Sequence, residues 1–148
     1  MRRASEMGHV RRIIQVGQRG LGSARSSDLA DAKTAGVHFV SSHQVHTAGV
    51  DPVLDLIEPG SNLLVTFDCD GLEPSIMPAV IGRVPGGLTY WQVVDLLRGA
   101  AKRARIASFD LVEFMPSRDV DGLGALVAGR ILATMLGLIV RQAAGHSS

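Results

Sequence analysis

The sequence has few of the features that mark several classes of protein. Its single cysteine excludes an internal disulfide and fits a reducing, cytoplasmic compartment. The formal net charge is +1, so there is no electrostatic case for nucleic-acid binding. No apolar run follows Arg2 and Arg3, and a signal peptide is therefore not predicted. We also find no internal repeat and no low-complexity segment.

The composition and the apolar pattern predict one α/β domain over residues 1–148. Hydrophobic residues make up 46% of the chain and charged residues 20%, which excludes a disordered chain. Predicted strands alternate with predicted helices, a pattern typical of a parallel sheet of about four strands with helices on both faces. The predicted strands are 12–16, 37–41, 63–67 and 105–112, and the predicted helices are 1–9, 26–35, 51–58, 89–104 and 122–143.

Helix caps support these boundaries. Ser26 or Ser27 is expected to cap the second helix, and Asp51 is expected to cap the third. Thr89 with Gln92 has the Thr-x-x-Gln pattern of a capping box.

The last predicted helix, 122–143, is long and apolar enough to resemble a membrane span. Arg130 lies in its middle, and the rest of the chain has an α/β alternation. We therefore expect a buried or interfacial helix and no membrane partner.

The predicted strand 63–67 leads directly into two carboxylates, Asp68 and Asp70. Residues two apart in a strand point to the same face, and open α/β sheets bind ligands at the carboxyl ends of their strands. Two like charges this close repel each other unless a cation lies between them, and hard oxygen ligands suit Mg²⁺ or Mn²⁺. The alternative is that Asp68 starts a turn which Asp70 and Gly71 complete.

Other polar residues are expected near the same edge. Glu113 follows the predicted strand 105–112, so it would share a crevice with the two aspartates. His43 and His46 also follow a strand, but their irregular spacing favours loop or surface histidines over metal ligands. The glycine-rich segment 18–22 lacks the lysine of a phosphate-binding loop and is interpreted as a turn. The loop 75–88 is long enough to be functional.

Three motifs in the same order resemble the ureohydrolases, the arginase and agmatinase family. Residues 66–74 read Thr-Phe-Asp-Cys-Asp-Gly-Leu-Glu-Pro and resemble the family's second metal motif, Ser-Phe-Asp-x-Asp-x-x-Asp-Pro. Residues 85–89, Pro-Gly-Gly-Leu-Thr, and 109–116, Phe-Asp-Leu-Val-Glu-Phe-Met-Pro, follow at sensible distances. Residues 14–20, Ile-Gln-Val-Gly-Gln-Arg-Gly, resemble the upstream strand of agmatinase-like members.

The resemblance implies a partial arginase-like three-layer αβα fold and a set of roles. Asp68 would bridge two Mn²⁺ ions, Asp70 would bind one of them, and Glu113 would hold the substrate guanidinium. The implied reaction is hydrolysis of a guanidino group to urea and an amine. Agmatine, guanidinobutyrate and related compounds all remain possible substrates.

The sequence also departs from the family. The Gly-Gly-Asp-His and Asp-Ala-His-x-Asp motifs, which supply the histidine ligands, are absent, so the chain resembles the carboxyl-terminal half only. Glu73 stands where the family has its third aspartate. Two functions follow as alternatives. One is a ureohydrolase whose other half is missing or is a separate chain, and the other is a non-catalytic remnant or assembly module.

The resemblance further implies that a strand of the missing half separates the strands 12–16 and 63–67. Because unpaired strand edges promote association, the chain is expected to form homo-oligomers or aggregates.

Overall fold

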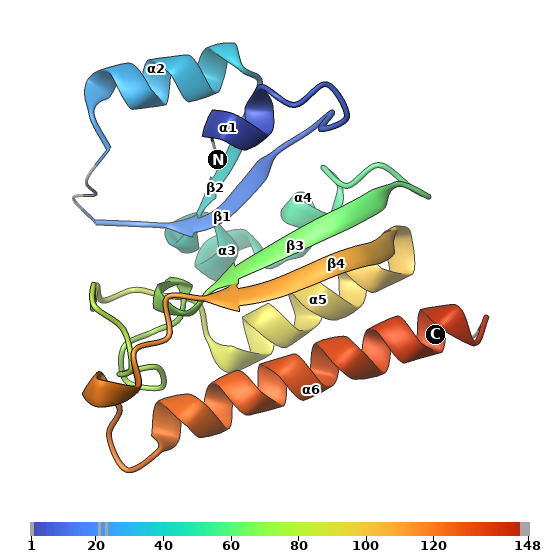
Figure 1. Ribbon diagram of the computed structural model, residues 1–148. Helices are drawn as coiled ribbons and strands as arrows, with labels where there is room; N and C mark the ends of the chain where they lie inside the picture. Colours follow the sequence, from blue (N-terminus) through green and yellow to red (C-terminus); the bar gives the residue numbers. More distant parts are fainter. Residues whose placement is uncertain (1, 21, 23, 146–148) are drawn as a thin grey trace.

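The computed structural model describes residues 2–20, 22 and 24–145, and four strands alternate with helices through this part of the chain (Figure 1). Both strand pairs are parallel, which confirms the predicted α/β class. The strands are β1 (Ile14–Gln18), β2 (His38–Ser41), β3 (Asn62–Asp68) and β4 (Arg105–Val112). The helices are α1 (Arg2–Ser5), α2 (Ser26–Thr34), α3 (Ser42–Ala48), α4 (Asp51–Leu54), α5 (Tyr90–Arg103) and α6 (Leu123–Ala143), with 3₁₀ turns η1 (Cys69–Gly71) and η2 (Pro116–Arg118).

The strands form two separate pairs, β1 with β2 and β3 with β4. Within the described residues β1 and β3 exchange no backbone hydrogen bond, as expected if a strand that this chain does not contain lies between them in the family fold. Side-chain donors connect the two halves instead. Arg12 donates to the carbonyl of Leu56, and Arg19 donates to the carbonyls of Asp70 and Leu72.

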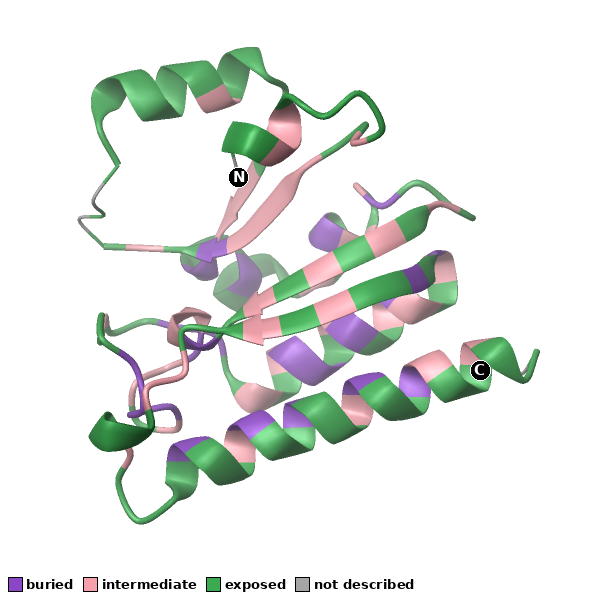
Figure 2. Ribbon diagram, in the orientation of Figure 1, coloured by how far each residue is buried: buried purple, intermediate pink, exposed green. Residues whose placement is uncertain are grey.

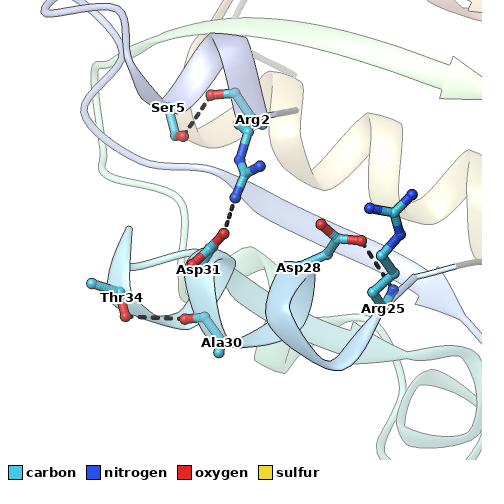
Figure 3. Close-up of polar contacts among 7 residues, drawn as sticks. All are labelled: Arg2, Ser5, Arg25, Asp28, Ala30, Asp31 and Thr34. Carbon is cyan, nitrogen blue, oxygen red and sulfur yellow. Dashed lines mark hydrogen bonds and ion pairs between the residues drawn. The ribbon is translucent and has the colours of Figure 1, made fainter.

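Helix α3 packs against the first pair of strands, and α2 lies on the other side of this pair (Figure 1). An ion pair between Arg2 and Asp31 connects α1 to α2, as Figure 3 shows. The N-cap of α2 is Arg25 rather than Ser26 or Ser27, and the Asp28 carboxylate accepts a hydrogen bond from its backbone N–H at 3.0 Å. That bond satisfies the N–H group of the N-cap residue, as the N3 carboxylate of a capping box does.

Among the described residues, helices cover the second pair of strands on one face. Helices α5 and α6 pack against this pair, and the alternate residues of β3 that face them are part of the core. The opposite face is open (Figure 2), with Leu64 69% exposed and Val112 41% exposed. Parallel strands are normally buried on both faces, so this open face lacks the second helical layer of a complete α/β fold.

Helix α5 follows the sequence prediction closely. The Thr89 hydroxyl accepts from the Gln92 N–H at 3.2 Å, and the Gln92 side chain accepts from the Thr89 N–H at 2.9 Å, which confirms the capping box. The side of α5 that faces the core carries the buried residues Val93, Val94, Leu97 and Ala100. Helix α4 is shorter than predicted, ending at Leu54, and its N-cap is Val50 rather than Asp51.

Helix α6 lies along the outside of the molecule against α5 and β4 (Figure 1). It is long and apolar enough to cross a membrane, with a mean hydropathy of 2.1, yet only 28% of its most apolar window is buried. Its buried residues are Gly124, Ala128, Ile131, Met135 and Leu138, at helical spacing. The helix therefore uses one face for the core and presents the other to solvent.

Candidate functional site

The carboxylates that follow β3 are positioned by a change in backbone conformation. Asp68 is the last residue of the strand, whereas Asp70 lies in the 3₁₀ turn η1, with buried Cys69 between them. The prediction that strand alternation alone places both aspartates on one face is therefore wrong. The two carboxylates nevertheless lie close together, so that the charge of Asp70 raises the pKa of Asp68.

Burial and neighbouring carboxylates perturb both titratable groups at the end of β3. The pKa of Asp68 is raised to about 6. The largest cause is burial, although the side chain still reaches solvent, and the nearby carboxylates of Asp70 and then Glu113 add to it. Burial together with the same carboxylates raises the pKa of the Cys69 thiol to about 12. The thiol is therefore neutral at physiological pH and is neither a nucleophile nor a thiolate ligand. The perturbed carboxyl group marks this edge as a candidate site.

The raised pKa of Asp68 predicts a specific pH dependence of stability. An ordinary aspartate titrates near 3.8, so between about pH 4 and 6 the folded chain holds a proton that the unfolded chain releases. The free energy of unfolding therefore falls as the pH rises through this window. We expect Asp68→Asn to raise Tm by a few degrees at pH 7.5 and to have little effect near pH 4, measured by circular dichroism without added metal.

The control for this experiment is Thr66→Val, which alters the same exposed side of β3 without removing a carboxyl group. Its Tm should stay parallel to that of the parent chain at every pH. An Asp68→Asn profile that is also parallel to the parent would contradict the assigned shift.

Glu113 stands directly after β4, in a backbone conformation that is rare for its residue type. Asp68 pairs with Val112 in the β3–β4 register, so Glu113 follows at the same edge as Asp68. Its φ is +58°, in the left-handed region that costs non-glycine residues free energy. Such conformations concentrate at functional sites, where surrounding structure maintains them. The structure thus places the three predicted carboxylates, Asp68, Asp70 and Glu113, within electrostatic reach of one another.

Arg19 is a residue of this edge that sequence reasoning missed, because segment 18–22 was interpreted only as a turn. Its guanidinium donates to the carbonyl of Asp70 at 2.7 Å, to that of Leu72 at 3.2 Å, and twice to that of Val84, at 2.8 and 3.0 Å. Arg19 therefore joins the end of β1 to the turn that carries Asp70 and to the loop 75–88. Its planar fork of donors suits such a multiple bridge.

Glu73, which stands where the family motif has its third aspartate, also makes contacts that the sequence did not predict. Its carboxylate accepts hydrogen bonds from the backbone N–H groups of Gly86 at 2.8 Å and Gly87 at 2.9 Å. Leu72 and Leu88 form a parallel bridge beside this contact. Glu73 therefore closes the base of the loop 75–88. Its side chain, one methylene longer than that of aspartate, reaches the two backbone N–H groups.

The two candidate histidines lie in helix α3 rather than in a loop. His43 is exposed and no hydrogen bond of its ring is found within the described residues. His46 bonds through Nε2 to the carbonyl of Gly87 at 2.9 Å and through Nδ1 to the Gln92 amide at 3.3 Å. Both ring nitrogens of His46 are therefore engaged in structural contacts, which disfavours a metal role in this arrangement.

The described residues supply only part of a metal site. Their carboxylate oxygens are donors that Mn²⁺ accepts, and the mutual repulsion that raises the pKa of Asp68 is what a cation would relieve. Among the described residues, however, no three His, Cys, Asp or Glu side chains are close enough together to hold an ion. Asp68 and Asp70 could thus supply some of the ligands of a metal ion but not a complete coordination shell.

A family model described as "Arginase family" matches residues 1–137. The chain belongs to the arginase family. It is 35% identical over 106 residues to the N(1)-aminopropylagmatine ureohydrolase of Thermus thermophilus, covering 71% of this chain and 35% of that protein. It is 34% identical over 135 residues to the mitochondrial arginase of Medicago truncatula, covering 88% of this chain and 38% of that enzyme.

Solved structures of the arginase family share the same fold. The arginase from Medicago truncatula superposes with a TM-score of 0.75 at 28% identity, over 93% of this chain and 43% of that one. The agmatine ureohydrolase of Thermoplasma volcanium gives a TM-score of 0.74 at 25% identity, over 90% and 44% of the two chains. The chain therefore spans between about a third and a half of the length of the arginase-family proteins it matches.

Proposed function

We propose that this chain provides the guanidinium-binding and part of the metal-binding machinery of an agmatinase-like amidinohydrolase, which releases urea and an amine. The observation that carries the proposal is the group of Asp68, Asp70 and Glu113 at one strand edge, on a chain that belongs to the arginase family. The relatives named as ureohydrolases support this reaction class.

Each carboxylate has a separate task in this proposal. Asp68 and Asp70 would hold Mn²⁺, which when bound would supply activation of water for attack on an amidino carbon. Glu113 would accept charge-assisted hydrogen bonds from the substrate guanidinium and so fix its orientation. The strained backbone of Glu113 supports a positioning task that requires one defined direction.

The metal proposal is tested by titrating the purified chain with Mn²⁺ in a calorimeter. Because two aspartates leave most coordination positions to water, we expect weak binding that Asp68→Ala abolishes. The matched control is Asp95→Ala, an exposed carboxylate on α5 that should leave the titration unchanged. Tight binding of two ions per chain, or equal losses in both variants, would contradict the assignment.

A second candidate is a non-catalytic assembly module of the same family. The observation that favours it is the open face of the β3–β4 pair together with the incomplete metal shell of the described residues. The two candidates differ in what an added amino-terminal half of a family member does. If the chain is part of an amidinohydrolase, the added half restores hydrolysis. If the chain is an assembly module, the added half binds to it without restoring hydrolysis.

A further inference from the structure

The turn that carries Asp70 depends on contacts from outside itself for a fixed conformation. The 3₁₀ turn η1 is closed by a backbone hydrogen bond from the Leu72 N–H to the Cys69 carbonyl at 3.2 Å. Gly71 follows Asp70 directly, and a glycine gives the backbone more freedom to rotate than any other residue. A carboxylate on such a turn keeps one direction only when other parts of the chain hold the backbone beneath it.

Two distant segments hold three successive backbone carbonyls, beginning with that of Asp70. Arg19 donates through Nη2 to the carbonyl of Asp70 at 2.7 Å and to that of Leu72 at 3.2 Å. Between them, the carbonyl of Gly71 accepts from the Leu88 N–H at 2.9 Å. Because a peptide group is planar, a held carbonyl fixes the orientation of the whole group. The main chain that carries the Asp70 side chain is therefore oriented from outside the turn.

The same guanidinium holds the loop 75–88 against the turn. Nε and Nη2 of Arg19 both donate to the carbonyl of Val84, at 3.0 and 2.8 Å. Two residues earlier, a Cβ added at Gly82 would lie 3.8 Å from Oδ2 of Asp70, so the loop backbone passes beside that carboxylate. Arg19 therefore fixes both the backbone that carries Asp70 and the loop segment next to its side chain.

These contacts use the shape of the arginine side chain and not only its charge. Within the described residues, every hydrogen bond of the Arg19 guanidinium goes to a backbone carbonyl, including that of Gly17 at 3.3 Å. No ion pair of Arg19 is found in this part of the chain. A planar fork of donors reaches several carbonyls in fixed directions, whereas the ammonium group of a lysine is a point charge on a flexible stem.

We propose that Arg19 is a positioning residue for metal binding, which fixes the direction of the Asp70 carboxylate through the backbone of η1 and through the loop 75–88. The inference rests on the proposed function, in which Asp70 holds Mn²⁺. Arg19 carries a positive charge and does not bind the cation, so it acts through Asp70. Replacing a residue that orients a metal ligand in this way typically weakens metal binding by about tenfold or more.

The charge of Arg19 makes the test sharp, because charge and positioning predict different results. A positive charge near a bound cation repels it, so on charge alone Arg19→Met would tighten Mn²⁺ binding and Arg19→Lys would leave it unchanged. Positioning predicts that both variants raise the dissociation constant of Mn²⁺ about tenfold, since neither keeps the planar fork. Calorimetry of the full chain, together with the electron paramagnetic resonance signal of free Mn²⁺, measures this constant.

The matched control is Arg103→Lys, at the other end of the β3–β4 pair. The guanidinium of Arg103 also joins two segments, donating to the Leu54 carbonyl at 2.7 Å and to the Asp55 carboxylate at 2.6 Å. Its replacement should lower Tm by a few degrees, as that of Arg19 does, and should leave Mn²⁺ binding unchanged. Equal losses of Mn²⁺ affinity in the Arg19 and Arg103 variants would mean that Arg19 only stabilises the fold, which would overturn the proposal.

Amide hydrogen exchange without metal separates the failure of this inference from the failure of the proposed function. Arg19→Lys should speed exchange of the Leu72 amide, which closes η1, whereas Arg103→Lys should not. An unchanged rate at Leu72, or unchanged or tighter Mn²⁺ binding by the Arg19 variants, would overturn the positioning role. Failure of the proposed function has a different signature, because the parent chain would then show no Mn²⁺ binding that Asp68→Ala removes.

Discussion

With Mn²⁺ added, the 148-residue chain on its own should release no urea from agmatine, guanidinobutyrate or arginine above a metal-only blank. Hydrolysis of this type needs metal ions held at a fixed separation, and the rate depends steeply on that geometry. Asp68 and Asp70 provide part of the ligands, and the described residues contain no group of three that could hold an ion. Glu113 can still orient a guanidinium, but orientation without an activated water contributes little to turnover.

A second part of the experiment tests whether activity returns when the chain is combined with the rest of a family enzyme. Co-expression or fusion with the amino-terminal half of an arginase-family enzyme should restore urea release, measured by a coupled colorimetric assay. Asp68→Ala or Glu113→Ala should then remove it, while Asp95→Ala on α5 should not. Urea production by the isolated chain would show that its own residues, or a second copy, complete the metal site.

Among substitutions that add one methyl group to the loop 75–88, Gly87→Ala should cause the largest loss of stability. A Cβ at Gly87 would lie 2.3 Å from the carbonyl carbon of Leu72 and 2.4 Å from the backbone nitrogen of Glu73, closer than any real contact. Backbone atoms cannot move aside as a flexible side chain can, so the hydrogen bonds of Glu73 to the loop must break. We expect a loss of ~2–4 kcal/mol, or about 10 °C in Tm.

The matched control for Gly87→Ala is Gly71→Ala in the adjacent turn η1. A Cβ there meets nothing within 4 Å, and the φ of Gly71 is not in the positive region. Thermal unfolding followed by circular dichroism should therefore show Gly71→Ala close to the parent chain. Equal Tm values for the two variants would mean that the loop base is not packed as described.

The sequence predicted the elements of this fold better than their assembly. Apolar periodicity and the Thr89–Gln92 capping box located α5 almost to the residue, because both are local properties. Whether β1 and β3 pair is not a local property, because an apolar strand pattern is the same in either case. Only the family resemblance indicated that these two strands are not neighbours.

The candidate site shows the same limit. Asp68, Asp70 and Glu113 could be found from their places after strands and from the family resemblance. The role of Arg19 could not, since the carbonyls of Asp70 and Val84 that it bonds lie 51 and 65 residues further along the chain. The conformation of Glu113 likewise depends on surroundings that no short pattern records. Contacts of side chains with distant backbone leave no periodic signal in a sequence.

The junction between the two strand pairs has a consequence for how the chain opens. No backbone ladder crosses from β1 to β3 in the described residues, and Arg19 crosses with side-chain N–H donors only. Amide hydrogen exchange in β1 and β2 should therefore report one cooperative unit and exchange in β3 and β4 another. Arg19 couples these units without protecting any amide proton itself, so replacing Arg19 should change the exchange rates of both units.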